Sequence, residues 1–379
     1  MNRRLLLVGA GHAHLEVVRR LGQNREISST LVTPEIHAAY SGMLSGVVAG
    51  SYRWEETRVD MRSLCERSGV DFVIGRATGV FPRQGELRLE DNRRLSYDVI
   101  SLATGSTPCT KSIAGAAEHG TPAKPLGCFF ARWQKLVASF EAGASDVPLE
   151  VLEVVVVGGG SAGVELALTM HHRLAAVSQT HAARARVTLV AERVLEDQSA
   201  RMQRLATSAL LARGIALVRE RVLQVTDEHV QTASGRRLDA DLVVLTTNAC
   251  APEWLRESGL ALDARGFLTV DRHLRSISHD NVYAAGDIAS MREQQVPKSG
   301  VYAVREGPVL YQNLCDAMAR RTPSAVFRPQ KRALAILACG DESAMLSYGA
   351  VALSGRWAWR LKEHIDRRFV RKYSAPQHA

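Results

Sequence analysis

The sequence has few cysteines and no long apolar run, and each shortage argues against a class of protein. None of its six cysteines stands in a C-x-x-C pair, which argues against a zinc ribbon or a thioredoxin-type motif. We expect all six to be reduced cytosolic thiols, most of them core residues. No apolar run approaches the roughly 20 residues that span a bilayer, and the run at 5–8 is too short for a signal peptide. The sequence therefore predicts a cytoplasmic protein, either free or at the cytoplasmic face of the membrane.

The composition is that of a globular protein with a surplus of positive charge. A chain of 379 residues suggests two domains and a small third region. Its 46% of hydrophobic and 23% of charged residues are ordinary for such proteins. The formal net charge of +9 indicates an anionic cofactor, a nucleic acid or an anionic membrane surface. Nucleic acid is the weakest of the three, because the basic residues concentrate in a tail without a nucleic-acid-binding motif.

A glycine turn follows the first apolar strand at 5–8. Gly9 permits a tight turn and Gly11 leaves room for phosphates, which predicts a pyrophosphate site at the N-terminus of the next helix. The third glycine of the G-x-G-x-x-G pattern is missing, and His14 stands in its place. The acid that usually ends the second strand and binds a ribose is also missing. Glu35 follows late, as either a ribose ligand or an exposed loop carboxylate.

A complete G-x-G-x-x-G fingerprint follows at 154–165, directly after a run of valines. It predicts a second dinucleotide site. The strand after it ends near Glu192, one residue from the usual ribose-binding position. Glu192 favours NADH, whereas the neighbouring Arg193 could accept the 2′-phosphate of NADPH. Of the two nucleotides, the sequence favours NADH.

Three further strands end in small residues. Residues 99–105 predict a buried strand with such an end, and residues 241–248 repeat the pattern. The chain therefore contains an internal duplication of a strand, a glycine turn, a helix and a closing strand. A third end at 281–289 carries an acid, and a helix opens after 297–300 and continues to about residue 320.

The segment 355–379 is basic and amphipathic. Its seven basic and two acidic residues contribute +5 of the total charge of +9. Apolar side chains recur every four residues, at Trp357, Leu361, Ile365, Phe369 and Tyr373. This pattern predicts a helix that lies on a membrane surface or docks on its own domain or on the second subunit of a homodimer.

Together these motifs resemble the two-dinucleotide-binding flavoproteins of the pyridine nucleotide–disulfide oxidoreductase fold, over essentially the whole chain. The resemblance implies an α/β fold with two Rossmann-like domains, for FAD and for NAD(P)H, the second inserted in the first. It places the FAD-binding domain at 1–110 and 265–325 and the NAD(P)H-binding domain at 111–264. Residues 326–379 then form a small C-terminal region that ends in an amphipathic helix and serves as an interface or docks on a membrane.

Within this superfamily the chain looks more like type II NADH dehydrogenases and sulfide:quinone reductases than like disulfide reductases. It lacks the redox cysteine pair of the disulfide reductases at 40–45. Sulfide:quinone reductases carry a cysteine near the second glycine loop, where this chain has Ser161 and Glu165, so sulfide chemistry is doubtful. Cys339 could match their C-terminal cysteine, and Cys109 or Cys128 could approach it, but we expect unpaired thiols.

A narrower similarity points to the dehydrogenase-like module that is fused to some selenide, water dikinases. It rests on the segments 9–14, 40–44, 297–301 and 357–369. The kinase itself is absent, and the similarity does not indicate a substrate.

The resemblance also implies a set of site residues. Those expected to bind the cofactors are Gly9, Gly11, His12, Ala13, His14, Thr33, Glu35, Ser41, Met43, Ala77, Ala103, Thr104, Gly105, Gly158, Gly160, Ser161, Ala162, Gly163, Glu192, Asn248, Gly286, Asp287, Lys298, Gly300 and Val301. Glu165 and Lys298 are the candidate catalytic residues. We expect no metal, because His12 and His14 stand two residues apart and point to different faces of a helix. His14 is expected to pack over the flavin nucleotide, with a catalytic part as the lesser alternative.

The implied reaction is a hydride relay. NAD(P)H bound across 158–163 gives hydride to flavin N5, and electrons pass on to a quinone-like acceptor. Asp287 hydrogen-bonds FAD, while Lys298 and the helix that begins at Gly300 stabilise the reduced flavin. Glu165 relays protons. The alternatives are that Glu165 is an ordinary acid at a helix N-terminus and Lys298 a solvated loop lysine.

Two other functions remain open. One is a flavin-dependent reductase or oxidase of a sulfur or selenium substrate, which would use Cys109, Cys128 or Cys339. The other is a non-catalytic flavoprotein that senses redox state.

Overall fold

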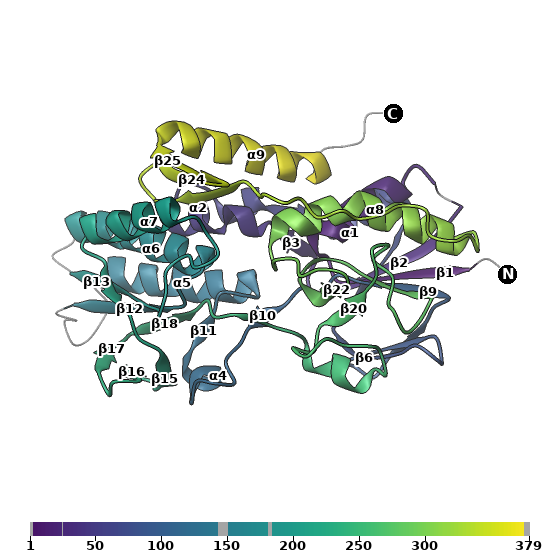
Figure 1. Cartoon of the computed structure of the whole chain (residues 1–379), viewed down its shortest axis with the longest axis horizontal. Coiled ribbons are helices and arrows are strands. Elements are labelled where there is room, and N and C mark those ends of the chain that lie inside the picture. The colour runs from purple at the N-terminus through teal and green to yellow at the C-terminus, as the bar shows by residue number, and fades with distance from the viewer. Residues whose placement is uncertain (1–2, 25, 143–150, 181–183, 375–379) are drawn as a thin grey trace.

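Two parallel five-stranded sheets organise the computed structural model, which describes residues 3–24, 26–142, 151–180 and 184–374. The sheets lie in two lobes, side by side in Figure 1, and the C-terminal segment covers both along the top of that view. We call the lobe of the N-terminal sheet the first lobe and the other the second lobe.

The first sheet is built on β1, whose residues 5–8 are all buried. Its strand order is β21-β9-β1-β2-β5, and Val8 lies opposite Val32 of β2 and Leu102 of β9. Because all five strands are parallel, their carboxyl ends meet at one edge, where such sheets bind ligands. The strands are β1 (Arg4–Val8), β2 (Ser28–Thr33), β5 (Asp71–Ile74), β9 (Val99–Leu102) and β21 (Val282–Ala284).

Two helices of the first lobe pack closely on each other. α1 (His12–Leu21) begins directly after the first glycine turn, and α8 (Gly300–Met318) lies against it. A Cβ added at Gly307 of α8 would stand 2.8 Å from the Cβ of Glu16. The absence of a side chain at position 307 therefore lets the two helices approach. A third helix, α3 (Met61–Ser68), is capped by Asp60, which accepts the Ser63 N–H at 3.0 Å.

The second lobe repeats this plan around β12. Its strand order is β11-β18-β12-β13-β14, all parallel, with Val157 opposite Val190 and Leu245. The repeated plan agrees with the predicted duplication, and the predicted α/β fold class is confirmed. The elements are β11 (Thr121–Pro122), β12 (Leu152–Val157), β13 (Ala185–Val190), β14 (Ala216–Val218), β18 (Leu242–Leu245), α5 (Leu126–Glu141), α6 (Ser161–Thr180) and α7 (Ala200–Ala212).

Each lobe also carries a three-stranded antiparallel sheet, β6-β7-β8 in the first and β15-β16-β17 in the second. These strands and the remaining short elements are β3 (His37–Ala39), β4 (Arg58–Asp60), β6 (Ala77–Phe81), β7 (Glu86–Leu89), β8 (Arg94–Ser96), β15 (Val222–Val225), β16 (His229–Thr232), β17 (Arg237–Asp239), β20 (Leu268–Val270), β22 (Ala289–Met291), α2 (Leu44–Ala49), α4 (Ala116–His119), η1 (Ser41–Met43), η2 (Trp54–Thr57), η3 (Glu253–Glu257) and η4 (Gly286–Ile288).

Two short strands join the lobes. β10 (Thr107–Pro108) leads from the first lobe to the second and β19 (Ala249–Cys250) leads back, and the two pair antiparallel. β10 lies between the two lobes in Figure 1. We call residues 107–111 and 247–253 the neck.

The C-terminal region, residues 335–374, packs on both lobes. It consists of the antiparallel strands β23 (Ala335–Ala338), β24 (Ala344–Tyr348) and β25 (Val351–Gly355), which the sequence analysis did not predict, and of α9 (Arg356–Ser374). Asp341 pairs with Arg213 of the second lobe at 2.6 Å. Lys372 pairs with Glu16 of the first lobe at 2.7 Å. The region therefore ties the two lobes together.

The predicted C-terminal helix is confirmed as α9, but its five apolar side chains spaced by four do not share one face. Trp357, Leu361 and Ile365 remain 49%, 37% and 39% exposed, whereas Tyr373 is only 1% exposed. A helix turns once every 3.6 residues, so a row of side chains spaced by four drifts around the axis. The row that begins in solvent at Trp357 therefore ends against the protein at Tyr373. The buried stripe of α9 is Ala358, Trp359, Lys362, Asp366, Val370 and Tyr373.

Candidate functional site

The first glycine loop is held tightly between β2 and β9. The Gly9 N–H donates to Val32 O at 2.7 Å, and the Gly11 N–H donates to Ala103 O at 3.1 Å. A Cβ would lie 2.6 Å from Ala103 O at Gly9 and 2.5 Å from it at Gly11. Both positions therefore need glycine for the packing of the chain itself, and Gly9 also has a φ of +89°.

The His14 ring fixes this loop in place through two hydrogen bonds. Its side chain is fully buried, with Nδ1 2.7 Å from Gly9 O and Nε2 2.9 Å from Ser101 Oγ. A carbonyl oxygen only accepts, so Nδ1 carries the proton and Nε2 accepts from the Ser101 hydroxyl. Because the ring is enclosed by the fold, it does not pack over a nucleotide as the sequence analysis expected.

The second loop is held in a different way from the first, and its third glycine is needed. A Cβ at Gly163 would stand 1.9 Å from Gly158 O and 2.7 Å from Thr246 Oγ1, so no side chain fits there. Thr246 locks this loop instead, by donating from Oγ1 to Val157 O at 3.0 Å. The two loops are thus fixed by a polar side chain from different positions, His14 in the first and Thr246 in the second.

The burial of His14 predicts a pH-dependent stability. Burial lowers its pKa from 6.5 to about 4, although the bond to Gly9 opposes the shift. The neutral ring therefore stabilises the fold fully above pH 6.5, and this contribution is lost as the pH falls towards 4. Its size is roughly 3 kcal/mol, from 1.36 kcal/mol per pKa unit.

His14→Asn should remove this dependence. Asparagine can still donate to Gly9 O but does not titrate, so the fall in unfolding free energy between pH 7 and pH 4.5 should be smaller in the variant. Urea denaturation of both proteins at both pH values measures it. His12, whose pKa burial also lowers to about 4, is present in both proteins and cancels. Parallel pH profiles would contradict the prediction.

Further predicted residues converge at the carboxyl edge of the first sheet. The Cβ position of Gly300, at the start of α8, lies 3.1 Å from the His12 ring and 3.7 Å from Ser41 Oγ. Asp287, which follows β21, accepts hydrogen bonds from Ser106 Oγ at 2.9 Å and from Lys124 Nζ at 2.7 Å. Burial opposes its ionisation, but Lys124 and Ser106 outweigh that effect and lower its pKa. Asp287 is therefore held as a carboxylate.

Lys124 joins the two lobes at this point. It lies between β11 and α5 of the second lobe, and its ammonium pairs with Asp287 of the first. Sequence reasoning missed Lys124, Ser106 and Ser101, because nothing in their local pattern marks them.

Lys298 lies beside this group but bonds to the backbone. Its Nζ donates to Ala289 O and stands 3.9 Å from the centre of the Phe267 ring. Burial lowers its pKa to about 8, although Asp287 opposes the shift. The neighbouring Glu306 accepts the Gly286 N–H, and burial raises its pKa to about 7.

The chain fits two dinucleotides in these loops. A Cβ at Gly160 of the second loop, or at Gly105 just after β9 in the first lobe, would meet no described atom within 4 Å, so each lobe leaves space beside its backbone there. The first N–H groups of α1 and α6 lack carbonyl partners within their own helices and favour an anion. FAD in the first loop and NAD(P)H in the second are compatible with this arrangement.

The other predicted residues divide by burial. Ala13 and Met43 lie in the hydrophobic core, so only their backbone can face a cofactor. Thr33 is buried at the end of β2, whereas Glu35 is exposed near the Cβ position of Gly127. Ala77, Gly158, Ser161, Gly286 and Gly105 are half-buried, and Thr104, Gly160, Ala162, Glu192, Asn248 and Val301 are exposed.

Glu165 lies in a buried charge cluster where α6, α2, β23 and α9 meet. Its Oε1 accepts the Ser45 hydroxyl at 2.9 Å and the Ala338 N–H at 2.8 Å. Lys362 of α9 places its Nζ 3.9 Å from the same oxygen and 2.9 Å from Asp366 Oδ2. We call Glu165, Lys362 and Asp366 the charge cluster.

The charge cluster holds a group that titrates near neutral pH. Lys362 and Asp366 are only 6% and 3% exposed. Burial raises the pKa of Asp366 to about 6 even though Lys362 opposes the shift, and Glu165 adds to the rise. The Tyr40 hydroxyl donates to Asp366. The sequence analysis missed Lys362 and Asp366, although their spacing of four on a basic helix is that of an ion pair.

An aromatic group connects the cluster to the first loop. The Tyr40 and Phe369 rings stack with centroids 4.2 Å apart, and His12 meets both edge-on at 5.3 and 5.5 Å. α9 thus reaches the start of α1, where the first loop ends.

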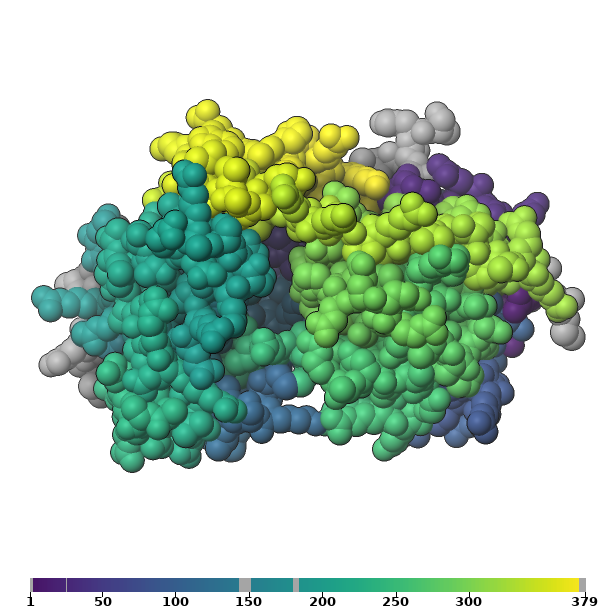
Figure 2. All heavy atoms as spheres, viewed as in Figure 1, coloured from purple at the N-terminus to yellow at the C-terminus, as the bar shows by residue number. Residues whose placement is uncertain are grey.

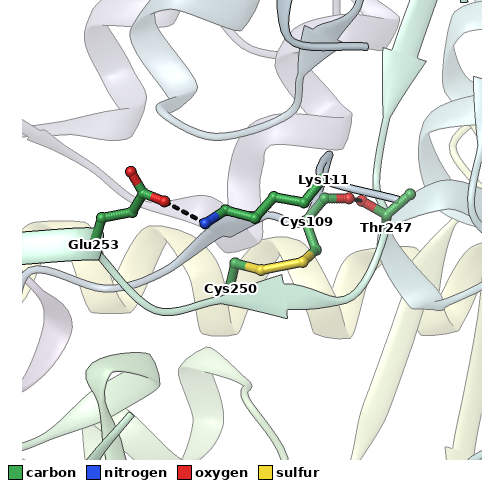
Figure 3. The surroundings of a disulfide bond; sticks show 5 residues. All are labelled: Cys109, Lys111, Thr247, Cys250 and Glu253. Atoms are coloured by element: carbon green, nitrogen blue, oxygen red, sulfur yellow. Dashed lines mark hydrogen bonds and ion pairs between the residues drawn. A yellow bond between two sulfur atoms is a disulfide. The ribbon is translucent and has the colours of Figure 1, made fainter. Parts of the chain in front are cut away.

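The prediction of six unpaired thiols is wrong. Cys109 and Cys250 form a disulfide in the neck (Figure 3). The pairing of β10 with β19 brings together two cysteines that are 141 positions apart, which the local sequence pattern cannot reveal. The free thiols are Cys65 and Cys339, both buried, with Cys315 half-buried and Cys128 exposed. Within the described residues, no three histidine, cysteine or acidic side chains group as a metal site.

Comparisons with known proteins agree with this geometry. The family model for pyridine nucleotide-disulphide oxidoreductases matches residues 3–307. A probable NADH dehydrogenase of Dictyostelium discoideum is 22% identical over 331 residues, which are 80% of this chain and 73% of that protein. A demethylphylloquinone reductase of Synechocystis is 25% identical over 389 residues, 98% and 92% of the two chains.

Among solved structures, that of NDH2 from Plasmodium falciparum in complex with NADH has a TM-score of 0.80. It is 14% identical, with 100% of this chain and 99% of that one covered, and this likeness concerns the fold. The predicted superfamily is confirmed. The narrower similarity to the module fused to selenide, water dikinase stays a prediction.

Proposed function

Because the chain belongs to the pyridine nucleotide-disulphide oxidoreductase family, we propose that it is an FAD-dependent enzyme that oxidises NAD(P)H and reduces a quinone. The observation that carries the proposal is the pair of glycine loops at the carboxyl edges of two parallel sheets, joined by the ion pair of Lys124 with Asp287. The space-filling view shows a cleft between the two lobes beneath the C-terminal region (Figure 2). Of the curated relatives, one is a probable NADH dehydrogenase and another a demethylphylloquinone reductase.

The residues of the chain divide the work between binding and proton transfer. FAD, when bound, supplies the hydride acceptor and the electron donor. Gly9, Gly11 and the start of α1 would bind its pyrophosphate. The Asp287 carboxylate oxygen that Ser106 and Lys124 leave free would accept a hydrogen bond from FAD. The second loop binds NAD(P)H, and Glu192 favours NADH.

Quinone reduction to a quinol also consumes two protons, and the charge cluster is placed to supply them. Glu165 and Asp366 are carboxylates that share the Lys362 ammonium. Asp366, with a pKa near 6, changes its protonation state close to neutral pH. We assign the proton relay to Glu165, which accepts the Ser45 hydroxyl and the Ala338 N–H. Lys362 and Asp366 position its charge.

A steady-state assay with different acceptors tests this function. We expect NADH oxidation to be slow without an acceptor and to rise steeply with a water-soluble quinone. Turnover with polysulfide or selenite, but not with quinone, would instead indicate a chalcogen reductase. Bound FAD without NADH turnover on any acceptor would indicate a redox sensor. Of the three cysteines named for the chalcogen alternative, Cys339 is buried and Cys109 is bonded to Cys250, so the exposed Cys128 is the one left to carry it.

We further propose that α9 docks the enzyme on an anionic membrane. Trp357, Leu361 and Ile365 form an exposed apolar ridge on α9, and the preceding strand exposes Val351 and Leu353. Exposed basic side chains flank the ridge, at Arg356, Arg360, Arg368, Arg371 and Lys372. An apolar ridge edged by positive charge suits the interface of an anionic bilayer. Among the helices of the described ranges, none is long and apolar enough to cross a membrane.

Making the ridge polar should weaken membrane binding without affecting turnover. We expect the triple variant W357S/L361E/I365E to bind anionic vesicles at least ~10-fold more weakly in co-sedimentation, because it loses buried apolar area. Its activity with a water-soluble quinone should be unchanged.

Leu211→Glu is the matched control. Leu211 is an apolar side chain on α7 of the second lobe and, at 59%, is more exposed than any of the three ridge residues. This variant should bind vesicles like the wild type. Unchanged vesicle binding by the triple variant would contradict the membrane proposal. Dissociation of a dimer on gel filtration would assign the ridge to the predicted homodimer instead.

A further inference from the structure

The neck is one of the ties that set how the two lobes face each other, beside the ion pair of Lys124 with Asp287 and the C-terminal region. The chain passes from the first lobe to the second through β10 and returns through β19. Each glycine loop belongs to a different lobe. Because hydride transfer requires the two reacting groups to come within about 3–3.5 Å, a small change of lobe orientation alters the reaction without altering either loop.

Few non-covalent contacts hold the neck. The Cys109 N–H donates to Asn248 O at 2.7 Å, and Thr247 Oγ1 donates to Cys109 O at 2.7 Å. Lys111 pairs with Glu253 across the outer side (Figure 3). Both members of that ion pair are more than half exposed, so it contributes little.

The disulfide between Cys109 and Cys250 adds the covalent tie. It closes a loop over 141 positions, and that loop contains the whole second sheet. Figure 3 shows it running from one neck strand to the other. Without the disulfide, the neck is held by the pairing of its two-residue strands, by two further hydrogen bonds and by one exposed ion pair.

Thiol exchange at the neck is sterically possible and selective. Cys109 and Cys250 are both half-buried, so each residue is open to solvent in part. Cys65 and Cys339 are buried, and burial raises their pKa to about 12 and about 11, which makes them poor nucleophiles. Cys128 is exposed but has no bonded partner, so it serves as a control.

We propose that Cys109 and Cys250 form a reversible redox modification site that latches the two lobes and is opened by a dithiol. One thiolate of the dithiol attacks a sulfur of the pair and forms a mixed disulfide. The second thiolate displaces the remaining neck cysteine. The neck gains two electrons and two protons and becomes two thiols, while the dithiol becomes a disulfide. The opened neck leaves the lobes joined by the ion pair of Lys124 with Asp287 and by the C-terminal region. The lobes then shift about these remaining ties, which slows transfer from nicotinamide to flavin.

The covalent state is measured first. Alkylation under denaturing conditions followed by mass spectrometry should find four free thiols in the oxidised protein and six after dithiothreitol, with the two new ones at Cys109 and Cys250. The Cys128→Ser protein should gain the same two. Six alkylated thiols in the oxidised folded protein would overturn the proposal.

The loosening of the neck on reduction is measured by proteolysis of the full chain. Limited proteolysis should cut the neck several-fold faster after reduction, and the C109S/C250S protein should be cut at the faster rate in either condition. Equal cutting of oxidised and reduced protein would overturn the proposal. Cys128→Ser should follow the wild type.

The kinetic effect rests on the proposed function. Stopped-flow reduction of bound flavin by NADH should be several-fold slower in reduced wild type and in C109S/C250S than in oxidised wild type, with equal FAD content. Equal rates would overturn the proposed control of the reaction. If NADH reduces none of these proteins, the proposed function fails, whereas thiol counting and proteolysis still decide whether the latch exists.

Discussion

Replacing Glu165 with glutamine is expected to slow quinone-linked turnover by roughly 10²-fold, the lower end of the effect of removing a general acid–base group. Glutamine has the same shape and keeps an oxygen that can accept from Ser45 and Ala338. Lys362 keeps Asp366 as its partner at 2.9 Å. The variant should therefore fold normally and lose only the charge and the transferable proton.

Two rates distinguish a proton relay from a structural role. Hydride transfer from NADH to the flavin needs no proton from Glu165, so its stopped-flow rate should change by less than about two-fold. Reoxidation of the flavin by quinone consumes protons, so its rate should show the roughly 10²-fold decrease. An equal decrease of both rates would assign Glu165 to positioning. Glu153→Gln, a carboxylate of the second lobe that pairs with Arg186 outside the cluster, is the matched control.

Replacing Gly160 with alanine is expected to raise KM for NADH by roughly 10- to 100-fold while FAD content and stability stay the same. A Cβ at this position meets no described atom within 4 Å, so the protein itself tolerates it. The added methyl group instead occupies the space that the phosphates need. Losing one or two charge-assisted hydrogen bonds of about 1.5 kcal/mol each accounts for this range.

Gly163→Ala is the informative comparison. A Cβ there would lie 1.9 Å from Gly158 O, so the helix must shift and the melting temperature should fall. We expect Gly160→Ala to weaken NADH binding at unchanged stability, and Gly163→Ala to lower stability. This pair of results would locate the nucleotide at the open side of the loop. An unchanged KM in Gly160→Ala would show that NADH binds elsewhere.

The sequence predicted the fold well because its signals are local. Runs of buried residues such as 5–8 and 154–157, each followed by a glycine turn, correspond to β1 and β12. The duplication was visible because both lobes repeat the same order of elements. The strands β23 to β25 were missed, although Gly340 and Gly349 lie in the two turns between them with positive φ.

The candidate site was predicted less completely because much of it depends on long-range contacts. Asp287 was identified from its place after a buried strand. Its partners Lys124 and Ser106 come from distant segments and have no distinguishing local pattern. The same reason applies to Cys250, which meets Cys109 only because the neck strands pair. His14 was noticed as an anomaly, but its role needed the positions of Gly9 and Ser101.

The geometry of α9 shows where a periodic pattern misleads. Five apolar residues spaced by four look like one stripe in the sequence. On a helix they drift around the axis, so Tyr373 is buried against Glu16 while Trp357 is in solvent. The residues between them, Lys362 and Asp366, supply the buried charge.

The central claim is that the two loops hold FAD and NAD(P)H close enough for hydride transfer. Anaerobic titration of the purified protein, followed by the visible absorbance of bound flavin, tests it most directly. We predict that one equivalent of NADH bleaches the flavin, that NADPH does so more slowly, and that added quinone restores the colour. A protein that retains flavin which neither NADH nor NADPH bleaches would contradict the claim.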